Sequence, residues 1–130
     1  MFIRLSPSSQ VFINGYSGGG ETLSLVLTMK PELCTRALHV ASVWYGELEP
    51  LVNAKTSVYF VIGGSDEYYG SSRISSTYRQ LVSRYREKGL SEDEINNLTV
   101  LDVKPSSYFD GGICRVAHDE QIRGWLFGKY

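Results

Sequence analysis

The sequence predicts an α/β fold, with a mainly parallel sheet of about four strands and flanking helices. Short β-rich segments alternate along the chain with segments whose apolar residues recur at helical spacing. Two of the strand segments, residues 37–44 and 58–62, are nearly continuous apolar runs, which is typical of strands covered on both faces. Buried strands joined by helices form parallel sheets with right-handed crossovers.

The first half of the chain predicts strand, tight turn, helix and two further strands. Residues 10–14 form a short β-rich run that ends at a glycine-rich turn, and a helix over residues 21–29 follows it. Pro31 ends this helix. The apolar strands at residues 37–44 and 58–62 complete this half.

The second half predicts three helices and a strand. Residues 73–88 carry one apolar stripe at helical spacing and end at Gly89. Ser91 and Glu94 have the spacing of a capping box for a short helix to residue 97. A strand at residues 98–104 and a helix at residues 119–127 follow.

Length and composition indicate one globular domain, residues 1–130. Hydrophobic residues make up 42% of the chain and charged residues 21%, which excludes a disordered chain and a disulfide-dense scaffold. No apolar run reaches the length of a membrane span, and the first residues lack the pattern of a signal peptide. We therefore expect a cytoplasmic protein with no membrane partner.

The charge balance argues against a nucleic-acid partner. Thirteen Lys and Arg stand against 14 Asp and Glu, so a net charge of -1 provides no field that attracts polyanions. The Arg and Tyr residues within 73–88 could suggest a nucleic-acid face, but their helical spacing favours an ordinary solvated surface. A small neutral substrate fits this balance better.

The cysteines and histidines predict neither a metal nor another cofactor. Cys34 and Cys114 lie far apart in sequence and form no CxxC pair, so we predict buried thiols. The two histidines, His39 and His118, have no second His at metal-ligand spacing. His39 lies in an apolar strand and is predicted to be structural.

A G-x-S-x-G pattern, Gly15-Tyr16-Ser17-Gly18-Gly19, stands between the first predicted strand and helix. A sharp strand-to-helix reversal holds the central serine in a strained backbone conformation, and flanking glycines leave room for it. We therefore predict Ser17 as a nucleophile and the N–H of Gly18 as an oxyanion-hole donor. The alternatives are a flexible glycine-rich turn and a phosphate-binding loop, although G-x-G-x-x-G and Gly-Lys-Ser/Thr are absent.

A serine nucleophile needs a base and a carboxylate that orients the base. Asp66 follows the strand at residues 58–62, which places it at the carboxyl edge of the sheet together with Ser17. Glu67 is its neighbouring substitute, and the alternative role of Asp66 is that of a turn former or a helix cap. His118 follows the last predicted strand and precedes the last helix, either as the base or as a solvent-exposed neighbour of the helix N-cap.

These segments resemble the α/β hydrolase superfamily, in its prolyl oligopeptidase-like and esterase-like branch, over the C-terminal half of that fold. The resemblance lies in residues 11–20, 59–67 and 118–127 and covers nearly the whole chain. It implies a serine hydrolase of the carboxylesterase or serine peptidase type that acts on a small ester or peptide through an acyl-enzyme. Ser17 would be the nucleophile and Asp66 the orienting acid, without a cofactor.

A second hypothesis is a non-catalytic, truncated hydrolase-like chain that acts as a fragment or within an assembly. About nine residues precede the first predicted strand, where similar proteins carry further strands and the loop with the second oxyanion N–H. Residues 110–114 hold no His, whereas similar proteins place the catalytic His in a loop there. An exposed sheet edge would permit homo-oligomers. A third, nucleotide-binding, hypothesis would use the glycine-rich turn.

Overall fold

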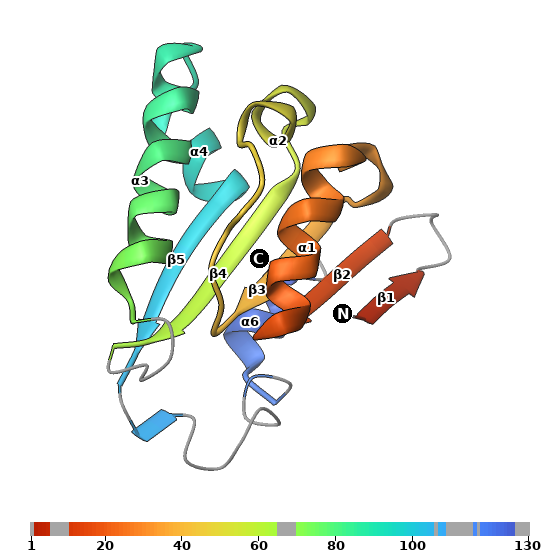
Figure 1. The fold of residues 1–130 in the computed structure, drawn as a ribbon. Coiled ribbons are helices and arrows are strands. Elements are labelled where there is room, and N and C mark those ends of the chain that lie inside the picture. Colours follow the sequence, from red (N-terminus) through yellow and green to blue (C-terminus); the bar gives the residue numbers. More distant parts are fainter. Residues whose placement is uncertain are drawn as a thin grey trace.

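The computed structural model describes residues 2–5, 11–64, 70–105, 107–108, 116 and 118–126 (Figure 1). In chain order its elements are β1 (Phe2–Leu5), β2 (Val11–Tyr16), α1 (Gly18–Met29), η1 (Pro31–Leu33), β3 (Arg36–Val40), α2 (Glu49–Ala54), β4 (Ser57–Gly63), α3 (Ser72–Glu87), α4 (Glu92–Leu98), β5 (Thr99–Lys104) and α6 (Glu120–Leu126). None of the helices in these ranges is long and apolar enough to cross a membrane.

The described strands form one sheet in the order β1-β2-β3-β4-β5. Strands β2 to β5 are parallel, and β1 pairs antiparallel with β2. In Figure 1, α1 and α3 lie over one face of the sheet and α6 lies behind it. The predicted α/β fold, with four parallel strands and flanking helices, is confirmed, whereas the antiparallel strand β1 was not predicted.

The strand predicted at residues 37–44 is wrong in its second half. β3 ends at Val40, because Ala41 adopts a left-handed φ of 51° and turns the chain out of the sheet. The apolar residues that follow, such as Val43, are buried without being part of a strand. α2 and the short η1 turn were not predicted either.

The core lies on both faces of the interior strand β4. Six consecutive residues of this strand, from Val58 to Gly63, are buried, as expected for a strand covered on both sides. Phe60 packs on the face of α1 and α3 against His39 and Trp44, and Tyr59 packs on the opposite face against Trp125 of α6. Packed side chains on both faces therefore support the sheet whose carboxyl ends form the edge next to Ser17.

Cys34 is a buried structural thiol, as predicted. Its exposed fraction is 6%, and its Sγ donates to the carbonyl oxygen of Arg36 at 3.0 Å. Burial raises the pKa of the thiol to about 12. Such a thiol stays protonated and unreactive at neutral pH. Cys114 lies outside the described residues.

Candidate active site

Ser17 stands at the turn between β2 and α1 in a strained backbone conformation. Its φ is 52° and its ψ is -117°, values that L residues rarely adopt. Within the described ranges only two other non-glycine residues, Ala41 and Lys55, have a positive φ. The sharp strand-to-helix reversal predicted from G-x-S-x-G is therefore present, whereas the role of Ser17 as a nucleophile stays a prediction.

Two glycines leave the space that this reversal needs. A Cβ atom on Gly15 would lie 2.5 Å from the carbonyl oxygen of Gly19, which is backbone and cannot swing aside. A Cβ on Gly20 would lie 2.6 Å from the Cβ of Ser42. Gly18 is different, because a Cβ there would meet nothing within 4 Å.

The backbone of Ser17 is fixed at both ends. Its N–H donates to the carbonyl of Val40 at 2.9 Å, and its own carbonyl accepts from the N–H groups of Gly20 and Glu21 at 2.9 and 3.2 Å. The Ser17 hydroxyl makes no capping hydrogen bond to α1. The side chain is half-buried, and the exposed Gly18 begins the helix beside it, where N–H groups have no partner within the helix.

His39 is structural, as predicted. It is fully buried, and its Nε2 lies 3.1 Å from the carbonyl oxygen of Val43, to which the ring N–H donates. Its ring packs against Trp44 and Phe60 at centroid distances of 5.6 and 5.4 Å. Burial lowers the pKa of His39 to about 4, so the ring is neutral and is committed to the core.

Of the two other predicted catalytic residues, Asp66 and His118, the described residues include His118. Asp66 and its neighbour Glu67 lie outside the described residues. His118 is exposed, in the turn that precedes α6. Among the hydrogen bonds of the described residues, none joins His118 to Ser17.

An ionic cluster ties the turn of His118 to the end of β5. Asp119 accepts a hydrogen bond from the hydroxyl of Tyr108 at 2.8 Å and pairs with Lys104 Nζ at 3.4 Å. Lys104 also pairs with Asp102 at 2.9 Å, and Asp102 accepts from Tyr59 at 2.6 Å. Because Lys104 ends β5, this cluster places the His118 turn at the carboxyl edge of the sheet, where Ser17 also lies.

Asp119 is held ionised within this cluster. Burial alone would raise the pKa of its carboxyl group, but the hydrogen bond from Tyr108, the N–H of Ile122 and the charge of Lys104 outweigh burial and lower it. Its Oδ1 accepts from the N–H groups of Gln121 and Ile122, so it also caps α6. Asp119 therefore anchors the start of α6 to β5.

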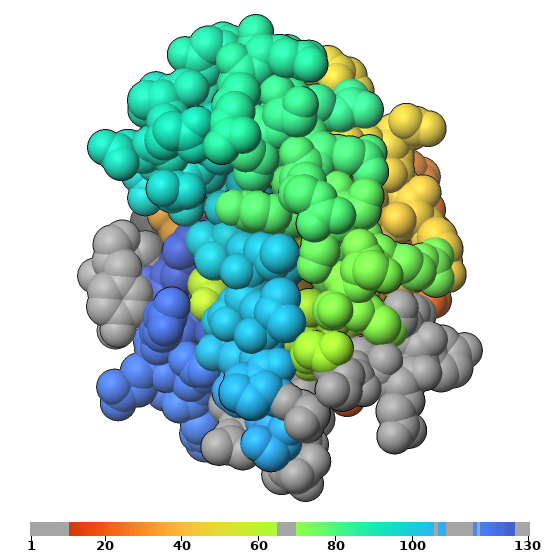
Figure 2. Space-filling view, turned by 90° about the vertical axis from the view of Figure 1, so that its left-hand side faces the viewer, coloured from red at the N-terminus to blue at the C-terminus, as the bar shows by residue number. Residues whose placement is uncertain are grey.

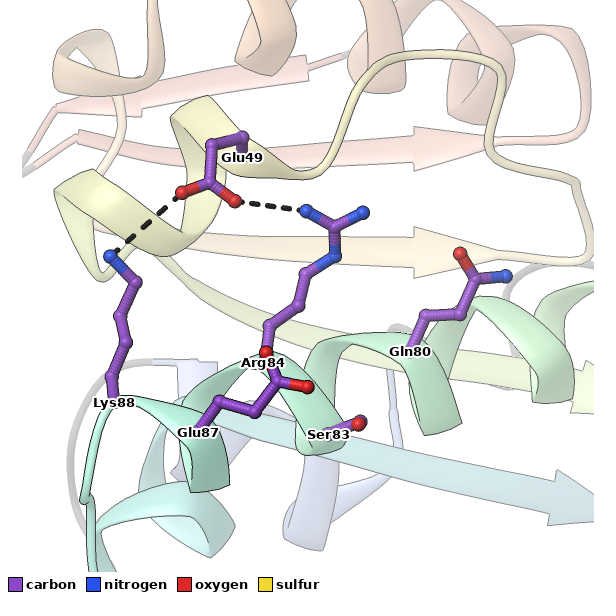
Figure 3. A pocket seen from close by; sticks show the side chains of 6 residues that line it. All are labelled: Glu49, Gln80, Ser83, Arg84, Glu87 and Lys88. Carbon is purple, nitrogen blue, oxygen red and sulfur yellow. Dashed lines mark hydrogen bonds and ion pairs between the residues drawn. The ribbon is translucent and has the colours of Figure 1, made fainter.

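A polar surface hollow of about 630 Å³ lies away from this edge (Figure 3). It is formed by α2 and the end of α3, and in Figure 1 these lie at the opposite end of the sheet from the start of α1. Glu49 pairs there with Arg84 at 2.9 Å and with Lys88 at 3.8 Å. Both basic groups of the hollow are thus paired with the same carboxylate.

A smaller hollow of about 370 Å³ lies at the carboxyl edge itself. It is lined by Val43 and Trp44, which follow β3, and by side chains of the first turns of α3 such as Arg73.

The part of the chain that the structure describes contains no group of three or more His, Cys, Asp or Glu side chains that could hold a metal ion.

The comparisons with known proteins relate the chain to an esterase in its fold. No family model matches the sequence, and no curated protein matches it. The crystal structure of a thermostable esterase matches with a TM-score of 0.64 and 17% sequence identity, over 90% of this chain and 30% of that one. The chain thus has an esterase-like α/β hydrolase fold and spans about 30% of the length of that esterase.

Proposed function

We propose that this chain is a serine hydrolase of the carboxylesterase or serine peptidase type, with Ser17 as its nucleophile. The observation that carries the proposal is the strained φ of 52° at Ser17, in a G-x-S-x-G turn between a parallel strand and a helix. A strain of this kind costs about 1–3 kcal/mol, and such strain clusters at functional sites. The esterase-like fold supports the same chemistry.

The proposed reaction forms an acyl-enzyme. The Ser17 hydroxyl attacks the carbonyl carbon of an ester or amide while His118 accepts its proton, and Asp66 holds the ring of His118 in the required tautomer. The N–H of Gly18 donates to the oxyanion of the tetrahedral intermediate. His118 then gives the proton to the leaving group, and water hydrolyses the acyl-enzyme.

A small ester or peptide is the proposed substrate class. The hollow beside Trp44 lies at the same edge of the sheet as Ser17, and its wall combines an indole ring, the hydroxyl groups of Ser72, Ser76 and Thr77, and the guanidinium of Arg73. Such a mixture of one aromatic surface and a few polar groups suits a small neutral acyl or leaving group. The near-zero net charge of the chain agrees with a neutral substrate.

A fluorophosphonate probe tests the nucleophile. We expect mass spectrometry to find the adduct on Ser17 and Ser17→Ala to lose it completely, because the probe bonds covalently to an activated serine hydroxyl. Ser83→Ala removes an exposed hydroxyl from α3, which is not part of the Ser17 turn. This variant is the matched control, and its Ser17 should still be labelled. A folded wild-type protein without an adduct, or an adduct that survives Ser17→Ala, would contradict the proposal.

Replacing the base and the orienting acid tests the remaining roles. We expect His118→Gln and Asp66→Asn each to slow the labelling of Ser17 by at least 10³-fold, because loss of a triad member costs several orders of magnitude. The second-order rate constant of labelling is the measurement. If His118→Gln labels at the wild-type rate, the base is a different group.

A non-catalytic hydrolase-like chain within an assembly is the second candidate function. It is favoured because neither described histidine is hydrogen-bonded to Ser17 as a base would be. His39 is buried and bonded to the carbonyl of Val43, and His118 makes no hydrogen bond to Ser17 within the described residues. Figure 2 shows β5 at the surface between α3 and α6, and such a sheet edge can pair with another chain. Light scattering together with the probe separates the candidates, because a strongly labelled monomer would exclude this one.

A further inference from the structure

We infer that Ser42 is a positioning residue of the proposed nucleophile: its hydroxyl holds the carbonyl of Ser17 and thereby keeps the strained turn in place. Ser42 Oγ donates to the carbonyl oxygen of Ser17 at 2.6 Å, and the Ser42 residue is completely buried. The inference deepens the proposed function and rests on it. Sequence patterns give no sign of this residue, because it lies in the apolar run that predicts a strand.

The path of β3 brings Ser42 to the turn. Tyr16 and Val40 are register partners at the last paired position of β2 and β3, so the two chains leave the sheet at the same level. Ala41 then turns the chain with a φ of 51°, while its N–H stays bonded to the carbonyl of Val61 at 2.8 Å. This second left-handed exit directs the Ser42 side chain towards Ser17.

Ser42 and Val40 hold Ser17 from both sides. The N–H of Ser17 bonds to Val40, and the carbonyl of Ser17 bonds to Ser42, so both peptide groups of the strained residue are anchored to one segment. Relaxation of φ would break the first bond, and rotation of ψ would break the second. A strained conformation persists only where its surroundings determine it more than once, and the Ser42 hydroxyl supplies one of these constraints.

Ser42 packs directly against Gly20 of the turn. Its Cβ faces the backbone of Gly20 so closely that a side chain on Gly20 would approach it to 2.6 Å. The N–H of Gly20 donates to the same Ser17 carbonyl at 2.9 Å. Alanine at position 42 would keep this contact, because it keeps the Cβ, and would remove the hydroxyl alone.

Ser24 provides a matched control on α1. It is also completely buried, its hydroxyl donates to the carbonyl of Glu21 at 2.7 Å, and it accepts from the N–H of Tyr45 at 3.1 Å. It makes no hydrogen bond to Ser17 among those described. Ser24→Ala therefore also removes a buried, hydrogen-bonded hydroxyl, but it leaves the carbonyl of Ser17 with all its described donors.

The labelling rate of Ser17, expressed per folded molecule, is the first measurement. We expect Ser42→Ala to slow fluorophosphonate labelling about tenfold, a barrier increase of about 1.4 kcal/mol, because the nucleophile is no longer held in one conformation. Ser24→Ala should stay within about twofold of the wild type although both variants unfold at lower urea concentration. Equal rates in the two variants would overturn the inference.

Backbone NMR is the second measurement and needs no reactivity. We expect Ser42→Ala to move the Cα and Cβ shifts of Ser17, which report its positive φ, and to speed hydrogen exchange at the Ser17 and Gly20 N–H groups. Ser24→Ala should leave all of these unchanged. Absence of the probe adduct in the wild type would refute the proposed function, whereas unchanged shifts and exchange in Ser42→Ala would refute the positioning role.

A measurement on the wild type decides the inference if Ser42→Ala does not fold. A buried hydroxyl bonded at 2.6 Å exchanges its proton slowly with water, so we expect an observable Ser42 hydroxyl resonance with a nuclear Overhauser effect to the N–H of Gly20. A hydroxyl proton that exchanges too fast to observe would overturn the inference.

Discussion

At position 17 a residue with a Cβ adopts a backbone conformation that favours glycine, while the true glycines nearby serve mainly to leave space. A Cβ added to Gly15 or Gly20 would lie 2.5 or 2.6 Å from a backbone or Cβ atom, whereas a Cβ added to Gly18 would lie in open space. The turn therefore combines one conformational demand, at Ser17, with two steric ones, at Gly15 within the motif and at Gly20 directly after it. From sequence, the pattern predicts the reversal, but it does not say which of its glycines are needed for space.

Gly20→Ala and Gly18→Ala should consequently differ in stability. We expect Gly20→Ala to lower the free energy of unfolding by about 1–3 kcal/mol, because its Cβ would force Ser42 or α1 to shift. Gly18→Ala should be neutral or stabilising by up to about 1 kcal/mol, since the new methyl group meets nothing and alanine favours the helix. Urea unfolding measures both, and equal losses would contradict the steric account.

The buried imidazole of His39 should make the protein less stable in mild acid. Its pKa in the folded protein is about 4, below the ordinary 6.5, so between these values the unfolded chain binds a proton that the folded chain does not. Stability is then full above pH 6.5 and falls as pH is lowered towards 4, by at most about 3 kcal/mol. Urea unfolding at several pH values in this range should show that the free energy of unfolding depends less on pH in His39→Gln than in the wild type. An identical pH dependence in the two proteins would refute the effect.

Elements whose ends carry a side-chain signal were predicted well. The capping box of Ser91 and Glu94 is present at the start of α4, with both reciprocal hydrogen bonds. The exit of β3 was not predicted, because the left-handed turn at Ala41 depends on tertiary contacts and alanine gives no sign of it. Likewise, residues 98–104 predict the strand β5 but not the charge cluster that Lys104 forms with α6.

Lys104 should therefore stabilise the junction of β5 and α6. Lys104→Met would leave Asp102 and Asp119, each largely buried, without their shared cation, and we expect a loss of about 2–3 kcal/mol in the free energy of unfolding. Arg86→Met is the control, because its pair with Glu92 is exposed to solvent and should contribute much less to stability. Comparable losses in urea unfolding would show that burial of the cluster is unimportant.

At the scale of the whole molecule, the alternation of strands and helices along the chain predicts the fold. The carboxyl edge of a parallel sheet gathers Ser17 and the His118 turn from segments far apart in sequence. Sequence order alone predicts this edge. It does not predict side-chain contacts across it, which depend on loop conformation, and Asp66 lies outside the described residues.

The single core makes the Cys34 thiol a reporter of global unfolding. Because the thiol is buried and its pKa is raised to about 12, we expect thiol reagents to modify it only when the chain unfolds. The modification rate of a Cys114→Ser variant, measured against urea, should follow the global unfolding curve. Rapid modification in the absence of urea would show that this part of the core opens by itself.

The hydrogen bonds described at the backbone of Ser17 join two short stretches, residues 17–21 and 40–42. This arrangement depends on the register of β2 and β3, and also on β4, because the carbonyl of Val61 accepts from the N–H of Ala41. A shift of the β2–β3 register by a single residue would therefore separate Ser17 from both Val40 and Ser42.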